Sequence, residues 1–89
     1  MSEKILLQIK KHSRYYHLAE ILKICRKQPK TPTQIFLPLH KKLTYKILKE
    51  VLQVALKAKL IEETEKGYIT TKKGELYIRR FKNLLKLLE

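Results

Sequence analysis

Aspartate is absent from this chain of 89 residues, and the sequence has only one cysteine. Without aspartate there are no Asp-based catalytic triads, no Asp dyads and few ways to build a Mg²⁺ or Ca²⁺ site. One cysteine cannot form an internal disulfide, so nothing requires an oxidising compartment. No apolar run approaches the roughly 20 residues that span a bilayer, and the amino terminus lacks a signal-peptide core and cleavage site. We therefore expect a cytoplasmic protein.

Positive charge is in large excess. The chain has 21 Lys and Arg against 8 acidic residues, which gives a net charge of +13. Hydrophobic residues make up 44% of the chain, enough for a folded domain, and the length allows only one. The commonest partner of so basic a protein is nucleic acid, and an anionic membrane surface is the alternative. Abundant lysine and scarce labile residues also favour a thermophilic source.

Glycine and proline are so few that they mark the ends of the predicted elements. They are Pro29, Pro32, Pro38, Gly67 and Gly74. Before the first of them, apolar residues at helical spacing predict a helix over about 14–28. The apolar run over residues 5–9 could lengthen this helix or form a short strand.

Two further helices are predicted next. Thr31 and Gln34 match a capping box, with proline at the first helical position, and Pro38 limits this helix to about two turns. The next helix begins at Thr44 and extends to about residue 58. Its apolar stripe consists of Leu48, Val51, Leu52, Ala55 and Leu56.

The hydrophobic period changes at Leu60. Residues 61–64 and 68–71 read as two strands joined by a tight turn, for which Gly67 supplies a positive φ. Residues 72–88 again show helical spacing. The sequence therefore predicts a mainly α (α+β) winged helix-turn-helix fold, with three helices, a β-hairpin wing and a C-terminal helix.

The third helix would be the recognition helix, lying in the major groove of DNA. Lys46, Lys49 and Gln53 share its polar side, and Thr44 and Tyr45 lie at its leading end. We expect lysines to contact phosphates, whereas Gln53 and Tyr45 touch bases. The alternative is an ordinary solvated lysine face. The candidate DNA-binding residues are Lys41, Lys42, Thr44, Tyr45, Lys46, Lys49, Gln53, Lys66, Lys72 and Lys73.

The predicted wing is acidic, since Lys66 is its only basic residue beside three glutamates. We therefore expect either that the wing stays off the DNA or that only Lys66 approaches it. Lys72 and Lys73 occupy the first turn of the last helix, where they oppose the macrodipole. They either form a phosphate site with the free amides or are simply tolerated.

The last helix has more apolar surface than one small domain can easily cover. We expect part of it to close the core and the distal part to pair with a second copy, giving a homodimer. Attachment to a membrane surface is the less favoured alternative. The candidate interface residues are Tyr77, Phe81, Leu84, Leu85 and Leu88. The predicted organisation is an extension over 1–13, the winged domain over 14–71 and a dimerisation helix over 72–89.

The sequence gives little indication of a catalytic or metal-binding site. His12 and Ser13 are neighbours, but no aspartate exists to orient the base. The three histidines and Cys25 lack metal-ligand spacing, and Cys25 is expected to pack as a small hydrophobe. There is no glycine-rich phosphate loop. We expect no enzymatic activity, no cofactor, no metal and no small-molecule substrate.

Four segments together carry a resemblance to a known family: residues 14–25, Leu43-Thr44-Tyr45-Lys46, Leu60-Ile61-Glu62-Glu63 and residues 68–75. They resemble the archaeal winged helix-turn-helix domains, in particular the small dimeric crenarchaeal DNA-binding proteins described as chromatin-type. The resemblance implies binding to double-stranded DNA through Thr44, Tyr45, Lys46 and Lys49. It also implies an antiparallel pairing of final helices through Phe81, Leu84, Leu85 and Leu88.

The sequence departs from that family at two places. Lys59 stands where the family favours glycine, which requires a left-handed lysine or a different helix end. The final helix, at about 17 residues or roughly 25 Å, is short for a coiled coil.

Double-stranded DNA binding, in gene regulation or in packaging at the nucleoid, is therefore the predicted function. An RNA- or ribosome-associated protein and a protein-interaction module remain as alternatives. An apolar edge of the third helix, formed by Ile47, Val54 and Ala58, favours the interaction module.

Overall fold

The computed structural model describes the backbone of residues 14–88. Its elements are helix α2 (Arg14–Ile24), helix α3 (Pro32–Phe36), 3₁₀ turn η2 (Leu37–Leu39), helix α4 (Tyr45–Lys57), strands β1 (Ile61–Thr64) and β2 (Gly67–Thr70), and helix α5 (Lys72–Leu88). This order confirms the predicted winged helix-turn-helix fold class. The expectations for residues 5–9 and for the extension over 1–13 lie outside the described residues.

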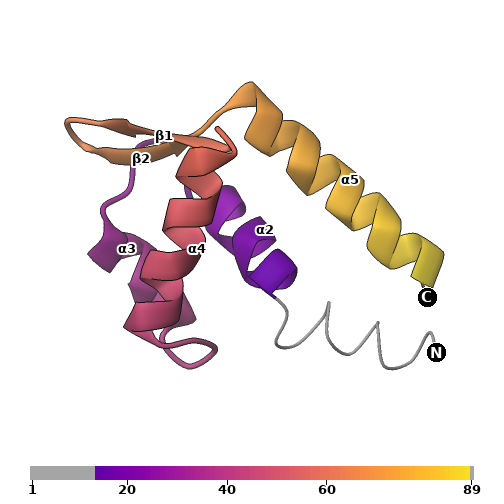
Figure 1. Ribbon diagram of the computed structural model, residues 1–89, viewed down its shortest axis with the longest axis horizontal. Helices are drawn as coiled ribbons and strands as arrows, with labels where there is room; N and C mark the ends of the chain where they lie inside the picture. Colours follow the sequence, from indigo (N-terminus) through magenta and orange to yellow (C-terminus); the bar gives the residue numbers. More distant parts are fainter. Residues whose placement is uncertain (1–13, 89) are drawn as a thin grey trace.

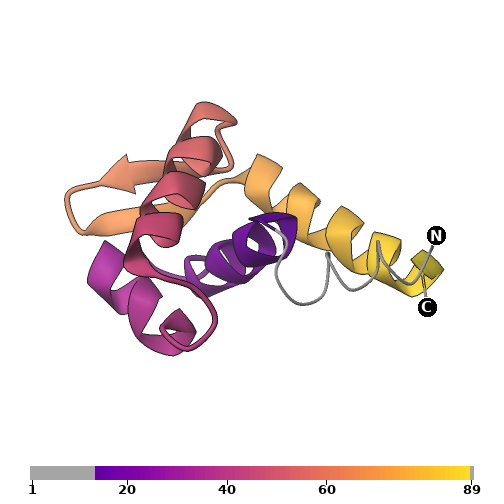
Figure 2. The same ribbon diagram turned by 60° about the horizontal axis from the view of Figure 1, so that its bottom comes forward.

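Helices α2, α3 and α4 surround one apolar core, onto which the base of the hairpin and α5 also pack. The hairpin and the far end of α5 point to opposite ends of the molecule (Figures 1 and 2). The core residues are Leu18, Ile21, Leu22, Cys25, Ile35, Leu39, Leu43, Leu48, Val51, Leu52, Ala55, Leu60, Ile61 and Ile78. The predicted apolar stripe of α4 is thus the part of that helix that faces the core.

The capping box at the start of α3 is confirmed. The Gln34 N–H donates to the Thr31 hydroxyl, and the Gln34 side-chain oxygen accepts from the Thr31 N–H. The predicted effect of Pro38 is also confirmed, because α3 ends at Phe36 and the chain tightens into the 3₁₀ turn that contains Pro38. This short helix and its turn connect α2 to α4 within the helix-turn-helix.

Helix α4 has a defined cap at each end. At its start the Thr44 hydroxyl accepts from the Ile47 N–H over 3.2 Å, and Leu43 before the cap is buried like Leu48 at the fourth helical position, as a hydrophobic staple requires. At its end the Leu60 N–H donates to the Ala55 carbonyl. The helix therefore begins and ends where the sequence predicted, within a residue.

The wing is a two-stranded antiparallel hairpin in which Ile61 pairs with Thr70 and Thr64 with Gly67. Gly67 has φ 130°, and a Cβ there would collide with the Lys30 carbonyl, so the position needs glycine for two reasons. Lys30 and Tyr68 exchange two backbone hydrogen bonds of 2.9 and 2.8 Å. The chain before α3 is thus attached to the outer edge of β2.

Helix α2 is shorter than expected, because it ends at Ile24 and not near residue 28. The end of this helix is held by the hairpin: the Thr70 N–H donates to the Cys25 carbonyl, and the Thr70 hydroxyl donates to the Leu22 carbonyl. These carbonyls therefore bond to β2 and not to further helical amides. Residues 25–30 cross over to the strand instead of continuing the helix.

Helix α5 begins at Lys72 as predicted and packs against α2. The Thr71 hydroxyl accepts from the Gly74 N–H over 3.1 Å and also donates to the Lys59 carbonyl over 2.7 Å. Further along, the Tyr77 hydroxyl donates to the Tyr15 carbonyl over 2.9 Å. The first half of α5 is therefore fixed to the domain.

Candidate nucleic-acid interface

The outer side of α4 is a basic surface opposite the core. Lys46, Lys49 and Gln53 are all exposed on it, as the helical spacing predicted. The one acidic residue of the helix, Glu50, is paired with Arg14 of α2 at 2.9 Å. The pairing cancels the negative charge on this helix, so the potential of its outer side is set by lysines.

Lys57 extends this face and was not singled out from the sequence. It is exposed, and it lies eleven residues after Lys46, which brings the two side chains to nearly the same angle around the helix axis. The same spacing could have identified it from the sequence. We define the α4 face as Lys46, Lys49, Gln53 and Lys57.

Tyr45 is held in place at the leading end of the α4 face. The residue is 44% exposed, and its ring packs edge-on against that of Phe36 of α3, with ring centroids 5.4 Å apart. The Lys49 ammonium lies 5.9 Å from the centroid of the same ring. Two neighbours therefore orient this aromatic side chain while its outer edge remains accessible.

The turn before α4 adds charge to the same end of the helix. Lys41 and Lys42 are exposed, and the backbone of the turn is fixed by bonds from the Lys42 and Leu43 N–H groups to the Leu39 carbonyl. The Lys42 ammonium lies 5.9 Å from the centre of the Tyr16 ring. Thr44, also exposed, uses its hydroxyl to cap α4.

The remaining predicted DNA contacts lie elsewhere. Lys66 is exposed in the hairpin turn, beside the exposed Glu65. Lys72 and Lys73 are exposed in the first turn of α5, which Figure 1 shows at the end of the domain where α4 ends. Lys41, Lys42, Thr44, Tyr45 and Lys46 gather at the opposite end, where α4 begins. The structure thus brings together most of the predicted residues, but not Lys66, Lys72 or Lys73.

The predicted interface residues of α5 divide into two groups. Tyr77 and Phe81 stack on each other and contact α2 of the same chain, Tyr77 through Tyr15 and Phe81 through the ring of Tyr16. Leu84 is 42% exposed and Leu85 is partly buried, whereas the side chain of Leu88 lies outside the described part. Leu76 and Leu87, which are not among the candidate interface residues, are 40% and 84% exposed. The exposed leucines are apolar side chains of α5 that the domain does not cover.

Cys25 has the structural role that was predicted for it. Its side chain is fully buried, and burial raises the pKa of the thiol to about 11. A thiol with so high a pKa is a poor nucleophile and metal ligand at neutral pH. Within residues 14–88 the structure shows no group of three or more side chains suited to a metal ion.

No helix among the described residues is long and apolar enough to cross a membrane. Comparison with models of known protein families gives a match to the winged helix-turn-helix family over residues 11–89. Comparisons with curated proteins and with solved structures give no match.

Proposed function

Because the chain belongs to the winged helix-turn-helix family, whose members generally bind DNA, we propose that it binds double-stranded DNA with α4 in the major groove. The observation that carries the proposal is the α4 face, where three lysines and a glutamine are exposed and the only carboxylate of the helix is neutralised by Arg14. Glu50 is the one carboxylate on this side of α4, and its pairing with Arg14 offsets the repulsion that it would otherwise exert on a phosphate backbone.

Most of the affinity would come from counterion release. Lys46, Lys49 and Lys57, with Lys41 and Lys42 on the preceding turn, would neutralise phosphates on either side of the groove. Tyr45 and Gln53 are the residues placed to reach base edges. A contact set dominated by lysine favours weak sequence specificity.

Lys66, Lys72 and Lys73 take minor roles in this proposal. Lys66 would be the single wing residue near a phosphate, with its glutamate neighbours limiting any closer approach. Lys72 and Lys73 would contact phosphates only where the duplex extends past the end of α4.

The role that we propose is chromatin-type packaging or transcriptional regulation at the nucleoid, in the cytoplasm, without catalysis. The resemblance to the crenarchaeal chromatin-type proteins supports it, as does the lysine-rich contact set. Residues 14–71 would be the DNA-binding unit, preceded by the extension over 1–13.

We also propose a homodimer through residues 72–89. Leu84, Leu85 and Leu88 remain the predicted contacts, and Leu76 and Leu87 join them because of their exposure. Tyr77 and Phe81 would support this surface from inside the protomer. A two-fold pairing of α5 would carry two α4 faces in one assembly.

The test is the salt dependence of binding to a duplex. Replacing Lys46 and Lys49 by alanine removes two phosphate contacts, so the slope of log K against log salt should flatten by about two units. Affinity should fall by a similar factor on every sequence, because phosphate contacts carry no sequence information. Fluorescence anisotropy at several salt concentrations measures both quantities.

The matched control replaces Lys82 and Lys86 of α5, which are exposed and lose the same charge, and its slope should stay close to that of the parent protein. Equal slopes for the α4 variant and the parent protein would contradict the proposal. Tighter binding to duplex RNA than to duplex DNA in direct competition would favour the RNA-associated alternative. Loss of DNA binding at physiological salt, with a stable protein partner retained, would favour the interaction module.

A further inference from the structure

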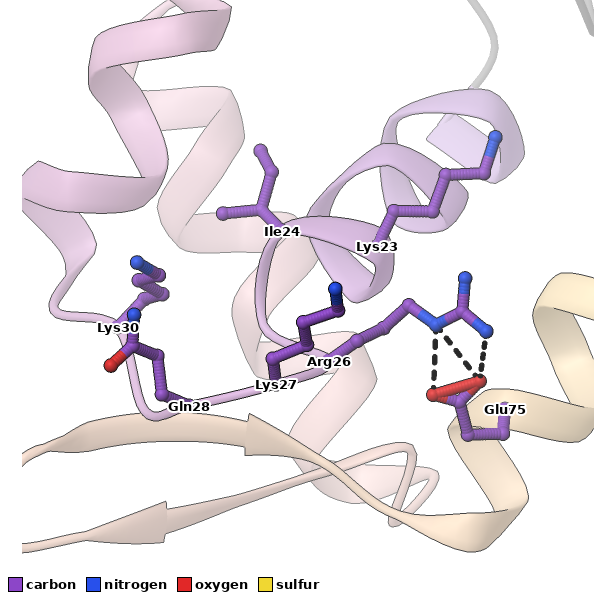
Figure 3. A pocket seen from close by; sticks show the side chains of 7 residues that line it. All are labelled: Lys23, Ile24, Arg26, Lys27, Gln28, Lys30 and Glu75. Carbon is purple, nitrogen blue, oxygen red and sulfur yellow. Dashed lines mark hydrogen bonds and ion pairs between the residues drawn. The ribbon is translucent and has the colours of Figure 1, made fainter.

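A second basic surface lies at the end of α2 and involves none of the predicted DNA-binding residues. It is an open hollow of about 590 Å³, lined by Lys23, Ile24, Arg26, Lys27, Gln28, Lys30 and Glu75. Figure 3 shows these side chains coming from the last turn of α2, from the chain that follows it, and from the first turns of α5. We call this surface the α2 hollow.

The charge of the α2 hollow is strongly positive, because it contains four cations and one carboxylate. That carboxylate, Glu75, is already bound: the Arg26 guanidinium donates to both of its oxygens over 3.0 Å and approaches it to 2.8 Å. The pairing raises the pKa of Arg26. Glu75 is the one carboxylate among the residues that line the hollow, so the charges of Lys23, Lys27 and Lys30 are not offset there. This is the charge pattern expected of a site for a polyanion.

The backbone under these lysines is fixed. Lys30 exchanges two hydrogen bonds with Tyr68, and the Cys25 carbonyl accepts from the Thr70 N–H over 3.1 Å. Segment 25–30 is therefore attached to β2 at both ends. A phosphate backbone bound here would cost little ordering of the chain, because the lysines start from a rigid base.

The α2 hollow lies on the other side of the domain from the α4 face. On α2, Lys23 is about 140° around the helix from Leu18, which faces the core shared with α4. The α4 face is likewise turned away from that core. Since packed helices have axes about 8–10 Å apart, the two surfaces are separated by more than the Debye length of about 8 Å at physiological ionic strength.

We propose that the α2 hollow binds the phosphate backbone of a second DNA duplex, so that one protomer can join two duplexes. This inference rests on the proposed function, since it takes the α4 face as the first DNA site. Duplexes on opposite sides of the domain would be screened from each other by the separation just described. We expect this binding to be independent of base sequence, because the lysine ammonium groups would contact phosphates as point charges.

The experiment measures capture of a second duplex, with Leu87→Glu present in the parent protein and in every variant so that the α4 face of a partner cannot supply the second site. A short duplex is immobilised and loaded with protein, and a labelled duplex of different sequence is then added. The test variant is Lys23→Gln/Lys27→Gln/Lys30→Gln, which leaves the Arg26–Glu75 pair intact. The control is Arg79→Gln/Lys82→Gln/Lys86→Gln, which loses the same charge from exposed positions of α5. Circular dichroism and light scattering establish that both variants keep the fold and the oligomeric state of the parent protein.

We expect the test variant to bind a single duplex nearly as well as the parent protein and to lose capture at least tenfold. The salt slope of capture should also flatten by nearly three units. The control should capture as the parent does. Capture that survives in the test variant, or is absent from a parent protein that binds single duplexes, would overturn this inference alone. Failure of the parent to bind any duplex would overturn the proposed function as well.

Discussion

Lys59 shows how one residue can depart from a family pattern without changing the fold. Its φ is 62°, in the left-handed region where glycine is usual. The Lys59 N–H donates to the Leu56 carbonyl and the Leu60 N–H to the Ala55 carbonyl, which is the hydrogen-bond pattern of a Schellman motif. Of the two outcomes that the sequence left open, the structure thus shows the left-handed lysine.

Lys59→Gly should stabilise the protein, because glycine adopts this conformation without the steric penalty of a Cβ. The gain in the free energy of unfolding should be about 0.5–1 kcal/mol, since the left-handed cost of roughly 1–2 kcal/mol is partly offset by the greater freedom of glycine in the unfolded chain. Urea denaturation measures it. Lys59→Ala is the control and should give no such gain. A less stable glycine variant would contradict the assignment.

Cys25 predicts a pH effect on stability. Burial raises the thiol pKa to about 11 from an ordinary value of 9.0. The neutral thiol is therefore favoured in the folded state, and its contribution is fully present below pH 9 and is lost as the pH rises through 11. The free energy of unfolding should fall more steeply over this range in the parent protein than in Cys25→Ala. Parallel pH curves for the two proteins would show that the thiol does not contribute.

At the scale of elements, the starts of α3 and α4 are set by side chains close to them in the sequence and could therefore be predicted from it. The capping box at Thr31 and the cap at Thr44 are satisfied within three residues of each cap, so the sequence contains all that is needed to predict them. The end of α2 could not be predicted in this way. It depends on Thr70, which is 45 residues further along the chain than Cys25 (70 − 25).

The same limit applied to the candidate site. Helical spacing placed Lys46, Lys49 and Gln53 on one side of α4, because spacing along a helix is a local property. The bridge between Lys30 and Tyr68 involves one residue pair and leaves no periodic signal. The α2 hollow depends on that bridge and on Glu75 from α5. It could therefore not be predicted as a site, although the basic residues that line it can be read from the sequence.

The distal half of α5 predicts how the proposed dimer can be broken. Leu87→Glu should leave the fold unchanged, because Leu87 is 84% exposed in the protomer. Burying a leucine is worth roughly 1.5–3 kcal/mol, and a two-fold interface contains it twice, so the dimer dissociation constant should rise at least tenfold. Sedimentation equilibrium measures it. Leu37→Glu, which changes another exposed leucine, should leave the constant unaltered. Equal effects of the two variants would contradict the α5 interface.

At the scale of the whole molecule, positive and negative charges lie on different surfaces of the domain. The α4 face and the α2 hollow are both basic. One glutamate lies at each of them and is paired with an arginine: Glu50 with Arg14 beside the α4 face, and Glu75 with Arg26 in the α2 hollow. The hairpin exposes three glutamates and one lysine. This separation gives the domain defined basic sides, which net charge alone does not.

The most direct test of the central claim, that α4 is the first DNA-binding surface, is an NMR titration of ¹⁵N-labelled protein with less than one equivalent of a short duplex. The account predicts that the largest amide shifts fall in α4 and in the turn over residues 40–44, with smaller changes in the hairpin. Shifts that avoid α4 and gather on α5 or the hairpin would contradict it.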